Sequence, residues 1–139
     1  MNQEEIIEIP RIDREVIENK GIIKKADIKF TKGLNLIIGD NATGKTTVIK
    51  YLLNHYDINS MASGNRIILE IQKALNSTAL IIDDYLGRLD KEKLIKALKE
   101  LVDSKRQIIA TLHSSQFNEI KGKIKANIIN TKDFKLKLK

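Results

Sequence analysis

The chain has 139 residues, of which 42% are hydrophobic, so a disordered chain is excluded and one domain over residues 1–139 is expected. The absence of cysteine excludes disulfides, thiol catalysis and cysteine-bound metals, and no apolar run approaches the ~20 residues of a membrane-spanning helix. The formal net charge of +7 fits a polyanionic partner such as nucleic acid, an acidic protein partner, or lysines that only solubilise a small domain and attract nucleotide.

The N-terminal third of the chain predicts antiparallel strands. Its first residues are polar and acidic, unlike a secretory signal, so we expect a cytoplasmic protein without membrane insertion. Glu4–Ile9 alternates weakly and is followed by Pro10, which is typical of an edge strand. The isoleucine-rich segment Ile12–Phe30 is interrupted by Asn19–Gly21 and predicts a hairpin, after which Thr31–Gly33 forms a second turn.

Residues Gly39–Thr46 (GDNATGKT) match the phosphate-binding P-loop pattern G-x-x-x-x-G-K-[ST]. The apolar run Leu34–Ile38 before the motif predicts a buried strand, and Thr47–Tyr56 after it has apolar residues at helical spacing. In the order strand, loop and helix, the loop amides and the positive end of the helix both point at a phosphate. The residues expected to cradle the phosphates are Gly39, Asn41, Ala42, Thr43 and Gly44.

Three residues at the end of the motif have distinct expected roles. We expect Lys45 to reach the β- and γ-phosphates, the Thr46 hydroxyl to ligate magnesium, and Thr47 to lie near the α-phosphate. Magnesium needs few protein ligands, because phosphates and water complete its coordination shell. The motif therefore predicts a site for a nucleoside triphosphate with magnesium, with ATP and Mg²⁺ as the expected ligands.

Helices and strands alternate in the next part of the chain. Asp57–Ser63 is polar and predicts a loop, whereas Asn65–Asn76 carries apolar residues at helical spacing. Ala79–Ile82 is short and wholly apolar, which indicates an interior strand. Asp90 is placed to cap a helix over Lys91–Asp103, whose leucines form an inner face.

The C-terminal part continues the alternation and then departs from it. Gln107–Leu112 predicts a strand, and Ser114 or Ser115 can cap a short helix after it. Lys123–Leu138 predicts a hairpin that turns at Thr131–Asp133. The expected fold class is α/β, with a mainly parallel core sheet flanked by helices and an antiparallel β flank at the N-terminus.

Two carboxylates follow the interior strand at Ala79–Ile82. In P-loop proteins a neighbouring strand delivers an aspartate to magnesium, and Asp83 fits that role. Asp84, one residue further, can orient the attacking water or accept its proton. The alternative is that both aspartates simply end a strand and cap a turn.

His113 and the segment Met61–Arg66 are further candidates. His113 ends a predicted strand, where it can approach the γ-phosphate, although a lone histidine there is more often structural. Met61–Arg66 places the small residues Ser63 and Gly64 before a helix, which suits an anion site at the helix N-terminus and equally suits ordinary capping.

In combination these motifs resemble the ABC-type ATPases, including their non-transporter branch of SMC-like and RecF-like heads. Met61–Leu75 (MASGNRIILEIQKAL) aligns without gaps with the LSGGQ signature and its helix. Asp83–Asp90 resembles the segment from the magnesium aspartate through the D-loop, and Ala110–Ser114 resembles the switch-histidine segment. Asn41 matches the asparagine common in the family's P-loop, and the resemblance extends over roughly residues 26–114.

The resemblance implies an ATP-dependent homodimer whose two copies face each other head to tail. Each nucleotide would lie between the P-loop of one copy and the signature of the other, so that Ser63 and Gly64 contact the γ-phosphate in trans. Lys45, Asp84 and His113 would then form the catalytic set. The chain departs from the family at the catalytic carboxylate, the signature and the helical lobe, and it also has no convincing match to the family's Q-loop glutamine between Thr47 and Ser60.

First, the family's catalytic glutamate is replaced by Asp84, whose side chain is one methylene shorter, so slow hydrolysis is expected. Second, Ala62 stands at the signature's serine position and Ser63 at a glycine position. Third, the interval between P-loop and signature is far shorter than usual, leaving almost no sequence for the helical lobe. This counts against both a transporter and an SMC-like tether.

Three functional hypotheses remain open from the residues. The first is a miniature ATPase that dimerises on ATP and relaxes after hydrolysis, acting on nucleic acid or on a protein partner. The second is a nucleotide-gated dimerisation module with negligible hydrolysis. The third is a small P-loop kinase, which requires an arginine-bearing lid, whereas the arginines of this chain are few and scattered.

Overall fold

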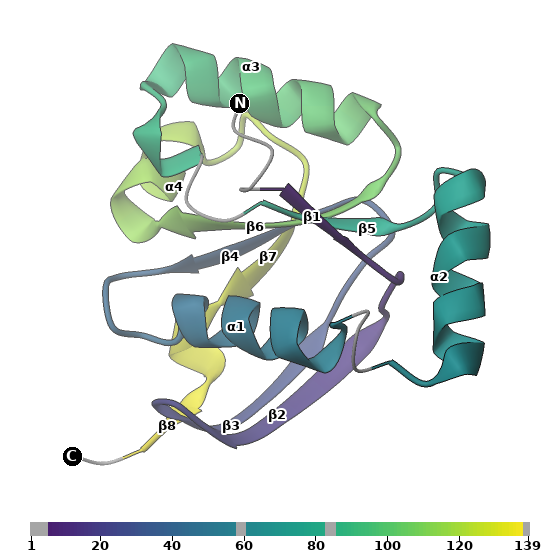
Figure 1. Cartoon of the computed structure of the whole chain (residues 1–139). Helices are drawn as coiled ribbons and strands as arrows, with labels where there is room; N and C mark the ends of the chain where they lie inside the picture. Colours follow the sequence, from purple (N-terminus) through teal and green to yellow (C-terminus); the bar gives the residue numbers. More distant parts are fainter. Residues whose placement is uncertain (1–5, 58–60, 83–85, 138–139) are drawn as a thin grey trace.

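The computed structural model describes residues 6–57, 61–82 and 86–137, which form two β-sheets and four α-helices (Figure 1). The larger sheet has the strand order β1 (Ile6–Ile9), β5 (Ala79–Ile82), β6 (Gln107–His113), β4 (Leu34–Gly39) and β7 (Asn127–Asn130). The smaller sheet contains β2 (Arg14–Lys20), β3 (Ile23–Lys29) and β8 (Lys135–Leu136).

The larger sheet is parallel except at one edge. Strands β5, β6, β4 and β7 run in the same direction, and only β1 pairs antiparallel, with β5. All six residues of β4 are buried, as expected for a central strand that is covered on both faces. The predicted α/β class, with a mainly parallel core and antiparallel N-terminal strands, is confirmed.

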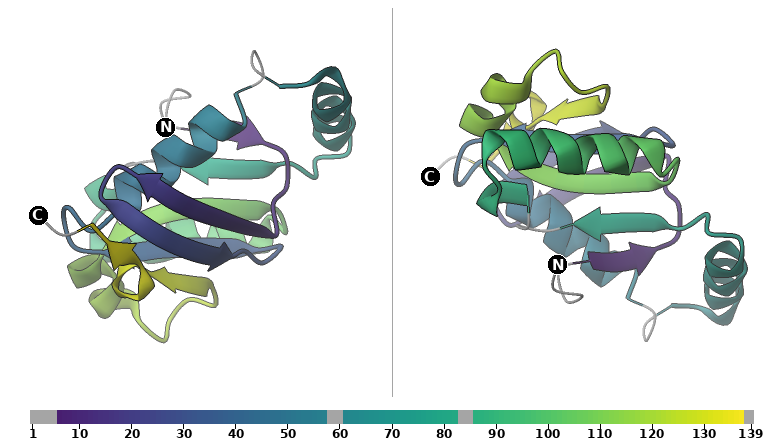
Figure 2. Two further views of the ribbon diagram at one scale, coloured as in Figure 1. Left: turned by 90° about the horizontal axis from the view of Figure 1, so that it is seen from below. Right: turned by 90° about the horizontal axis from the view of Figure 1, so that it is seen from above.

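Helices cover the larger sheet in separate layers. Helix α1 (Lys45–His55) lies between the two sheets and buries Val48, Ile49 and Leu52 (Figures 1 and 2). Helices α3 (Lys91–Asp103) and α4 (Ser114–Ile120) cover the opposite face. Helix α2 (Ser63–Ala74) stands apart, beyond the end of the sheet where β1 stops and β5 begins (Figure 2). Within the described ranges, no helix is long and apolar enough to cross a membrane.

The start of α3 follows the sequence expectation. The Asp90 carboxylate accepts a hydrogen bond of 2.9 Å from the Lys93 backbone N–H, which satisfies one of the free donors at the helix start. Leu94 and Leu98 are fully buried beneath this helix. The predicted cap and inner face of α3 are therefore confirmed.

Two buried side-chain amides hold the segment that contains β2 and β3 against the larger sheet at both of its ends. The Gln107 side chain accepts from the Ile12 N–H at 3.0 Å and donates to the Ile12 carbonyl at 2.6 Å. Asn35 is fully buried, and its side-chain oxygen accepts from the Thr31 N–H at 2.9 Å. These bonds satisfy backbone groups where Ile12–Phe30 leaves and rejoins the core, which holds the hairpin over α1.

The predicted C-terminal hairpin is wrong. β7 pairs parallel with β4 in the larger sheet, whereas β8 pairs antiparallel with β3 in the smaller one. Thr131–Asp133 forms a 3₁₀ turn that carries the chain from one sheet to the other. The reason is packing, because Ile129 and Phe134 are both buried in the core that surrounds α1.

Helix α2 is present as predicted, but its apolar residues are not part of the core. Ile67, Ile68, Ile71 and Leu75 are 60%, 50%, 55% and 72% exposed. Leu69 is instead the residue that α2 buries. Helical spacing identified the element correctly, while the face that packs was decided by how the chain approaches the end of the sheet where β5 begins.

A buried carboxylate joins α1 to the smaller sheet. Glu15 on β2 is only 9% exposed, and the Tyr56 hydroxyl just after α1 donates a hydrogen bond to its carboxylate. Burial and this bond to Glu15 raise the pKa of Tyr56. The fold therefore favours the neutral phenol, because its O–H group donates the hydrogen bond that the buried carboxylate accepts.

We expect the stability of the protein to fall above about pH 10, where tyrosines of the unfolded chain ionise while Tyr56 stays neutral in the fold. Because its pKa is raised in the folded state, its contribution is complete below that pH and is lost as the pH rises further. Tyr56→Phe should lower stability by about 1–3 kcal/mol at neutral pH, because Glu15 loses its donor.

The measurement is urea unfolding of both proteins between pH 7 and 11. The difference between them should shrink at high pH, and a difference that stays constant would contradict this assignment.

Candidate nucleotide-binding site

The P-loop lies between the end of β4 and the start of α1, as the motif predicted. β4 ends at Gly39 and α1 begins at Lys45. Strand and helix are both anchored in the core, so the loop between them is held at the carboxyl edge of a parallel sheet. The backbone N–H groups in the first turn of a helix have no acceptor within the helix, and the first turn of α1 adjoins this loop, which is the arrangement that binds phosphate at a helix N-terminus.

Two glycines of the loop are required by its packing. Gly44 has φ +110°, and a Cβ there would lie 3.2 Å from Cγ1 of Ile23. A Cβ at Gly39 would lie 2.2 Å from Oγ1 of Thr131 and 2.6 Å from Oγ1 of Thr43. At Gly39 any side chain would therefore collide with its neighbours, whereas at Gly44 the positive φ is the conformation that favours glycine.

The polar side chains of the loop are oriented by the loop's own backbone. The Lys45 ammonium donates to the Gly39 carbonyl at 2.5 Å, which draws this cation back over the loop. The Thr43 hydroxyl donates to the Asp40 carbonyl at 2.7 Å. Thr46 is exposed at the first turn of α1 and Thr47 is half-buried beside it. Lys45 and Thr46 thus lie together at the start of α1, directly after the loop.

His113 lies beside the start of the P-loop. β6 and β4 pair in parallel register with His113 opposite Gly39, so a residue 74 positions later in the chain reaches the same level of the sheet. The His113 Nδ1 atom accepts from the Ser115 N–H at 3.1 Å, and Nε2 lies 3.8 Å from the Asp40 carboxylate. Because Nδ1 is an acceptor, the neutral ring carries its proton on Nε2, the nitrogen that faces the loop.

This geometry corrects the predicted cap of the short helix. α4 begins at Ser114, and its N-cap is His113, whose ring nitrogen accepts from the Ser115 backbone. A serine hydroxyl was expected there. The Ser115 hydroxyl instead lies 2.9 Å from His113 Nδ1 and helps to fix the ring.

The two predicted acidic residues, Asp83 and Asp84, lie outside the described residues. The strand that delivers them is described: β5 ends at Ile82, which is opposite Ala110 in the parallel pairing with β6. β5, β6 and β4 consequently end at the same edge of the sheet. Across residues 6–57, 61–82 and 86–137, no group of three histidine, aspartate or glutamate side chains could hold a metal ion.

The predicted signature residues lie away from the P-loop of their own chain. α2 begins at Ser63, and both Ser63 and Gly64 are exposed. Figure 1 places the P-loop at the end of α1 that follows β4, and α2 beyond the opposite end of α1. An eleven-residue helix is about 16 Å long. The structure therefore does not bring Ser63 and Gly64 to Lys45 within one chain.

Sequence reasoning missed a pocket beside the P-loop. A cavity of about 460 Å³ lies between α1 and the turn joining β2 to β3, a size that suits a small ligand. Thr47 lines it next to the P-loop, and the Tyr51 ring stacks on His55 with a centroid distance of 5.4 Å. The signal was present as two aromatic rings, Tyr51 and His55, one turn apart in the second half of α1, and only the position of the hairpin turned them into a pocket wall. Its lining is Lys20, Gly21, Thr47, Lys50, Tyr51, Asn54 and His55.

Comparison with known proteins gives two matches. A family profile described as an AAA domain matches residues 16–54, which include most of β2, all of β3 and β4, the P-loop and most of α1. The DNA replication and repair protein RecF of Acetivibrio thermocellus is 27% identical over 121 residues, covering 76% of this chain and 32% of that protein. The chain thus spans about a third of this relative's length. No solved structure gives a significant match.

These matches confirm the resemblance to SMC- and RecF-like P-loop ATPases. The aligned part of the RecF relative extends well beyond the segment that the AAA profile matches. The P-loop is therefore not an isolated motif within an unrelated sequence.

We expect Gly39→Ala to destabilise the protein by about 1–3 kcal/mol, because its Cβ would overlap Oγ1 of both Thr131 and Thr43. Gly33→Ala is the matched control, since a Cβ at Gly33 meets nothing within 4 Å. Chemical denaturation of both variants measures the difference. Equal stability of the two variants would contradict the close packing described for the loop.

Proposed function

We propose that the chain is an ABC-type ATPase domain with a P-loop NTPase fold that binds ATP and Mg²⁺ and hydrolyses ATP slowly. The observation that carries the proposal is the convergence of Lys45, Thr46 and His113 at one edge of the parallel sheet, around a loop built to bind phosphate. The similarity to an AAA domain and to RecF supports ATP as the nucleotide.

In this proposal the P-loop amides hold the phosphates and Lys45 neutralises the charge that develops on the β- and γ-phosphoryl oxygens. Thr46 and Asp83 would hold a magnesium ion, which would supply positive charge beside the phosphates. The base and ribose enter the cavity beside Thr47, where the Tyr51 ring offers a stacking surface. ATP would thus lie along α1, with its triphosphate at the helix start.

The chemical step is attack of water on the γ-phosphorus. Asp84 orients the water and accepts its proton, while the bond from the γ-phosphorus to the β–γ bridging oxygen breaks and ADP and inorganic phosphate are the products. His113 donates from Nε2 to a γ-phosphoryl oxygen, a role supported by its position opposite Gly39. Asp84 is shorter than the glutamate of the family, so the water is held less firmly and turnover is slow.

The site is completed by a second copy arranged head to tail. Ser63 and Gly64 lie beyond the far end of α1 and cannot meet the triphosphate bound to their own chain, so they are proposed to meet that of the partner. Gly64 supports this, because a Cβ there would meet nothing within 4 Å and internal packing does not require the glycine. The N-terminus of α2 would then bind the γ-phosphate across the interface.

A nucleotide-gated module with negligible hydrolysis is the second candidate, favoured by aspartate at position 84. Both candidates predict that Asp84→Asn protein shifts from smaller to larger species on size-exclusion chromatography when Mg-ATP is added. Lys45→Ala should abolish the shift, because it removes the cation that holds the phosphates.

Steady-state phosphate release separates the two candidates. If the native protein releases phosphate and the Asp84→Asn protein does not, the chain is an ATPase. Absence of both nucleotide binding and the size shift would refute the proposed function.

Nucleic acid is the proposed partner, supported by a cluster of lysines as well as by the printed name of the RecF relative. Lys99, Lys123 and Lys125 line a shallow cavity between α3 and the segment that follows α4. Repulsion from Lys91 and Lys99 lowers the pKa of Lys123, so these ammonium groups crowd one another. A phosphate backbone would relieve that repulsion.

We expect duplex DNA affinity to fall steeply with salt, with a slope near −0.9 for each phosphate contacted. Lys99→Gln with Lys123→Gln should reduce the slope by about 1.8, whereas Lys132→Gln with Lys135→Gln at the C-terminal end should leave it unchanged. Fluorescence anisotropy across a salt series measures both. If instead only the C-terminal pair of substitutions reduced the salt slope, the DNA contact would lie at the C-terminal lysines. An affinity of the native protein that did not change with salt would exclude a phosphate contact.

A further inference from the structure

The turn that follows β7 packs against both glycines of the P-loop. Thr131 lies beside the first of them, because a Cβ at Gly39 would overlap its Oγ1 atom. Phe134 lies beside the second, since a Cβ at Gly44 would be 3.4 Å from Cδ2 of its ring. Thr131 and Phe134 are only 2% and 9% exposed, so this turn supports the loop from within the fold. We call residues 131–134 the loop brace.

Hydrogen bonds and strand pairing fix the loop brace at both of its ends. The Asn130 side chain accepts from the Lys132 N–H at 3.0 Å, and the Phe134 N–H donates to the Thr131 carbonyl at 3.0 Å. Before the brace β7 pairs with β4, and directly after it β8 pairs with β3. The position of Thr131 is therefore set by the two sheets and not by the loop that it contacts.

The Thr131 hydroxyl is a buried polar group without a partner. Among residues 6–57, 61–82 and 86–137, no group forms a hydrogen bond with its Oγ1 atom. Removing a hydroxyl from water without a compensating hydrogen bond costs free energy, so such groups are rare in native folds and each needs an explanation. The backbone carbonyl of Thr131 is satisfied, so the exception is confined to the side chain that faces the P-loop.

The space that this hydroxyl faces is shared with a hydroxyl of the P-loop. A Cβ at Gly39 would overlap Oγ1 of both Thr131 and Thr43, so the two oxygens approach the same point from different segments of the chain. The Thr43 hydroxyl uses its proton for the Asp40 carbonyl at 2.7 Å, which leaves the lone pairs of its oxygen as acceptors. A small movement of the loop would therefore let Thr131 donate to Thr43.

We propose that Thr131 is a positioning residue for the P-loop, whose hydroxyl donates a hydrogen bond to Thr43 Oγ1 when the loop holds phosphate. The inference rests on the proposed nucleotide site. Phosphate draws the loop amides toward the anion, and Thr43 is among the residues expected to cradle it, so phosphate binding is the event that moves the Thr43 side chain. The hydrogen bonds then run from Thr131 through Thr43 to the Asp40 carbonyl and hold the loop closed on the nucleotide.

Thr131→Val tests the hydroxyl, because it keeps the shape of the side chain and removes the polar group. The nucleotide-free variant should be at least as stable as the native protein, since the unpartnered hydroxyl is gone. Its affinity for Mg-ADP should be lower by about threefold to tenfold, which is the effect of one neutral hydrogen bond. A residue that only supports the fold would not lower nucleotide affinity while sparing stability.

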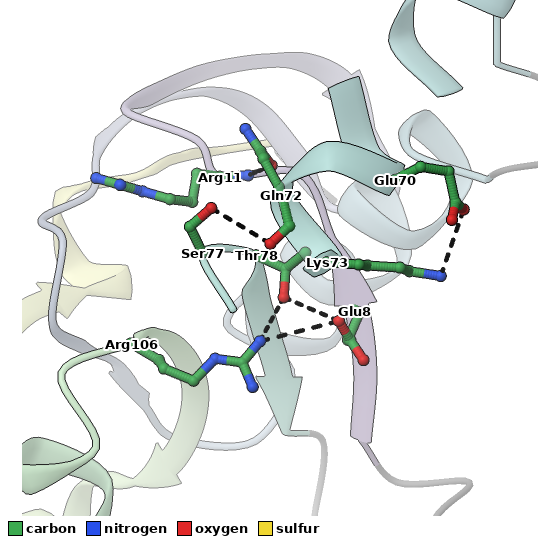
Figure 3. Close-up of polar contacts among 8 residues, drawn as sticks. All are labelled: Glu8, Arg11, Glu70, Gln72, Lys73, Ser77, Thr78 and Arg106. Atoms are coloured by element: carbon green, nitrogen blue, oxygen red, sulfur yellow. Dashed lines mark hydrogen bonds and ion pairs between the residues drawn. The ribbon is translucent and has the colours of Figure 1, made fainter. Parts of the chain in front are cut away.

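Thr78 offers a matched control, because it is a buried threonine whose hydroxyl is satisfied. It is 0% exposed, donates to Glu8 at 2.9 Å and accepts from the Arg106 guanidinium at 2.5 Å (Figure 3). It precedes β5, whose other end is at the P-loop edge of the sheet. Thr78→Val should therefore lower stability and leave the affinity for Mg-ADP unchanged, the opposite pattern to Thr131→Val.

Isothermal titration calorimetry with Mg-ADP measures the affinities, and urea unfolding measures the stabilities. Mg-ADP avoids both hydrolysis and any contact that depends on the γ-phosphate. Thr131→Ser retains the hydroxyl and should recover most of the affinity. Thr131→Val combined with Thr43→Val should bind no more weakly than Thr43→Val alone, because the hydroxyl acts through Thr43.

Equal affinity of the native and Thr131→Val proteins would overturn the proposal and leave the proposed ATPase function untouched. An equal loss of affinity in Thr131→Ser and Thr131→Val would also overturn it, because the hydroxyl would not be the group responsible. Additive losses in the double variant would overturn the route through Thr43. Native protein that binds neither Mg-ADP nor Mg-ATP would instead refute the proposed function itself.

Discussion

The parallel pairing of β4 with β6 is the constraint on which the candidate site depends. It places His113 opposite Gly39, so two residues far apart in the sequence share one level at the carboxyl edge of the sheet. The pairing is stable because both strands are buried along almost their whole length, between α1 on one face and α3 with α4 on the other. In such a sheet the strand ends are the only part left free to meet a ligand.

Helix α1 connects that edge to the rest of the molecule. Its buried face packs against the larger sheet and against the hairpin of the smaller sheet, so the P-loop at its start is supported from two directions. The same packing brings the β2–β3 turn over the helix and creates the cavity beside Thr47. The antiparallel flank thus contributes a wall to the proposed nucleotide site in addition to covering the core.

Helix α2 is held differently from the other helices. It buries little beyond Leu69, and it is positioned through polar contacts at its C-terminal end. Its N-terminus is exposed, and it is the part of the helix that is proposed to contact the triphosphate of a second copy.

Much of this protein followed from local patterns. The P-loop was recognisable because phosphate binding demands glycine, lysine and threonine at fixed spacing, and β5 and α3 were recognisable from an apolar run and a capped amphipathic helix. Leu94, Leu98 and Asp90 behave as their spacing indicates, since a helix on a sheet has only one face to bury. The α/β class and the edge position of β1 followed from the same kind of evidence.

Three features were decided by tertiary structure. β7 pairs parallel with its neighbour in the larger sheet, and β8 pairs in the smaller sheet. Burial of Ile129 and Phe134 around α1 stabilises this arrangement more than a local hairpin would. Tyr51 and His55 became a pocket wall only when the distant β2–β3 turn closed over them. Ile67, Ile68, Ile71 and Leu75 had the spacing of a core face, yet α2 meets the body at an edge that receives Leu69. Sequence periodicity therefore determined that these residues share one side of a helix, and the long-range packing of α2 decided that this side faces outward.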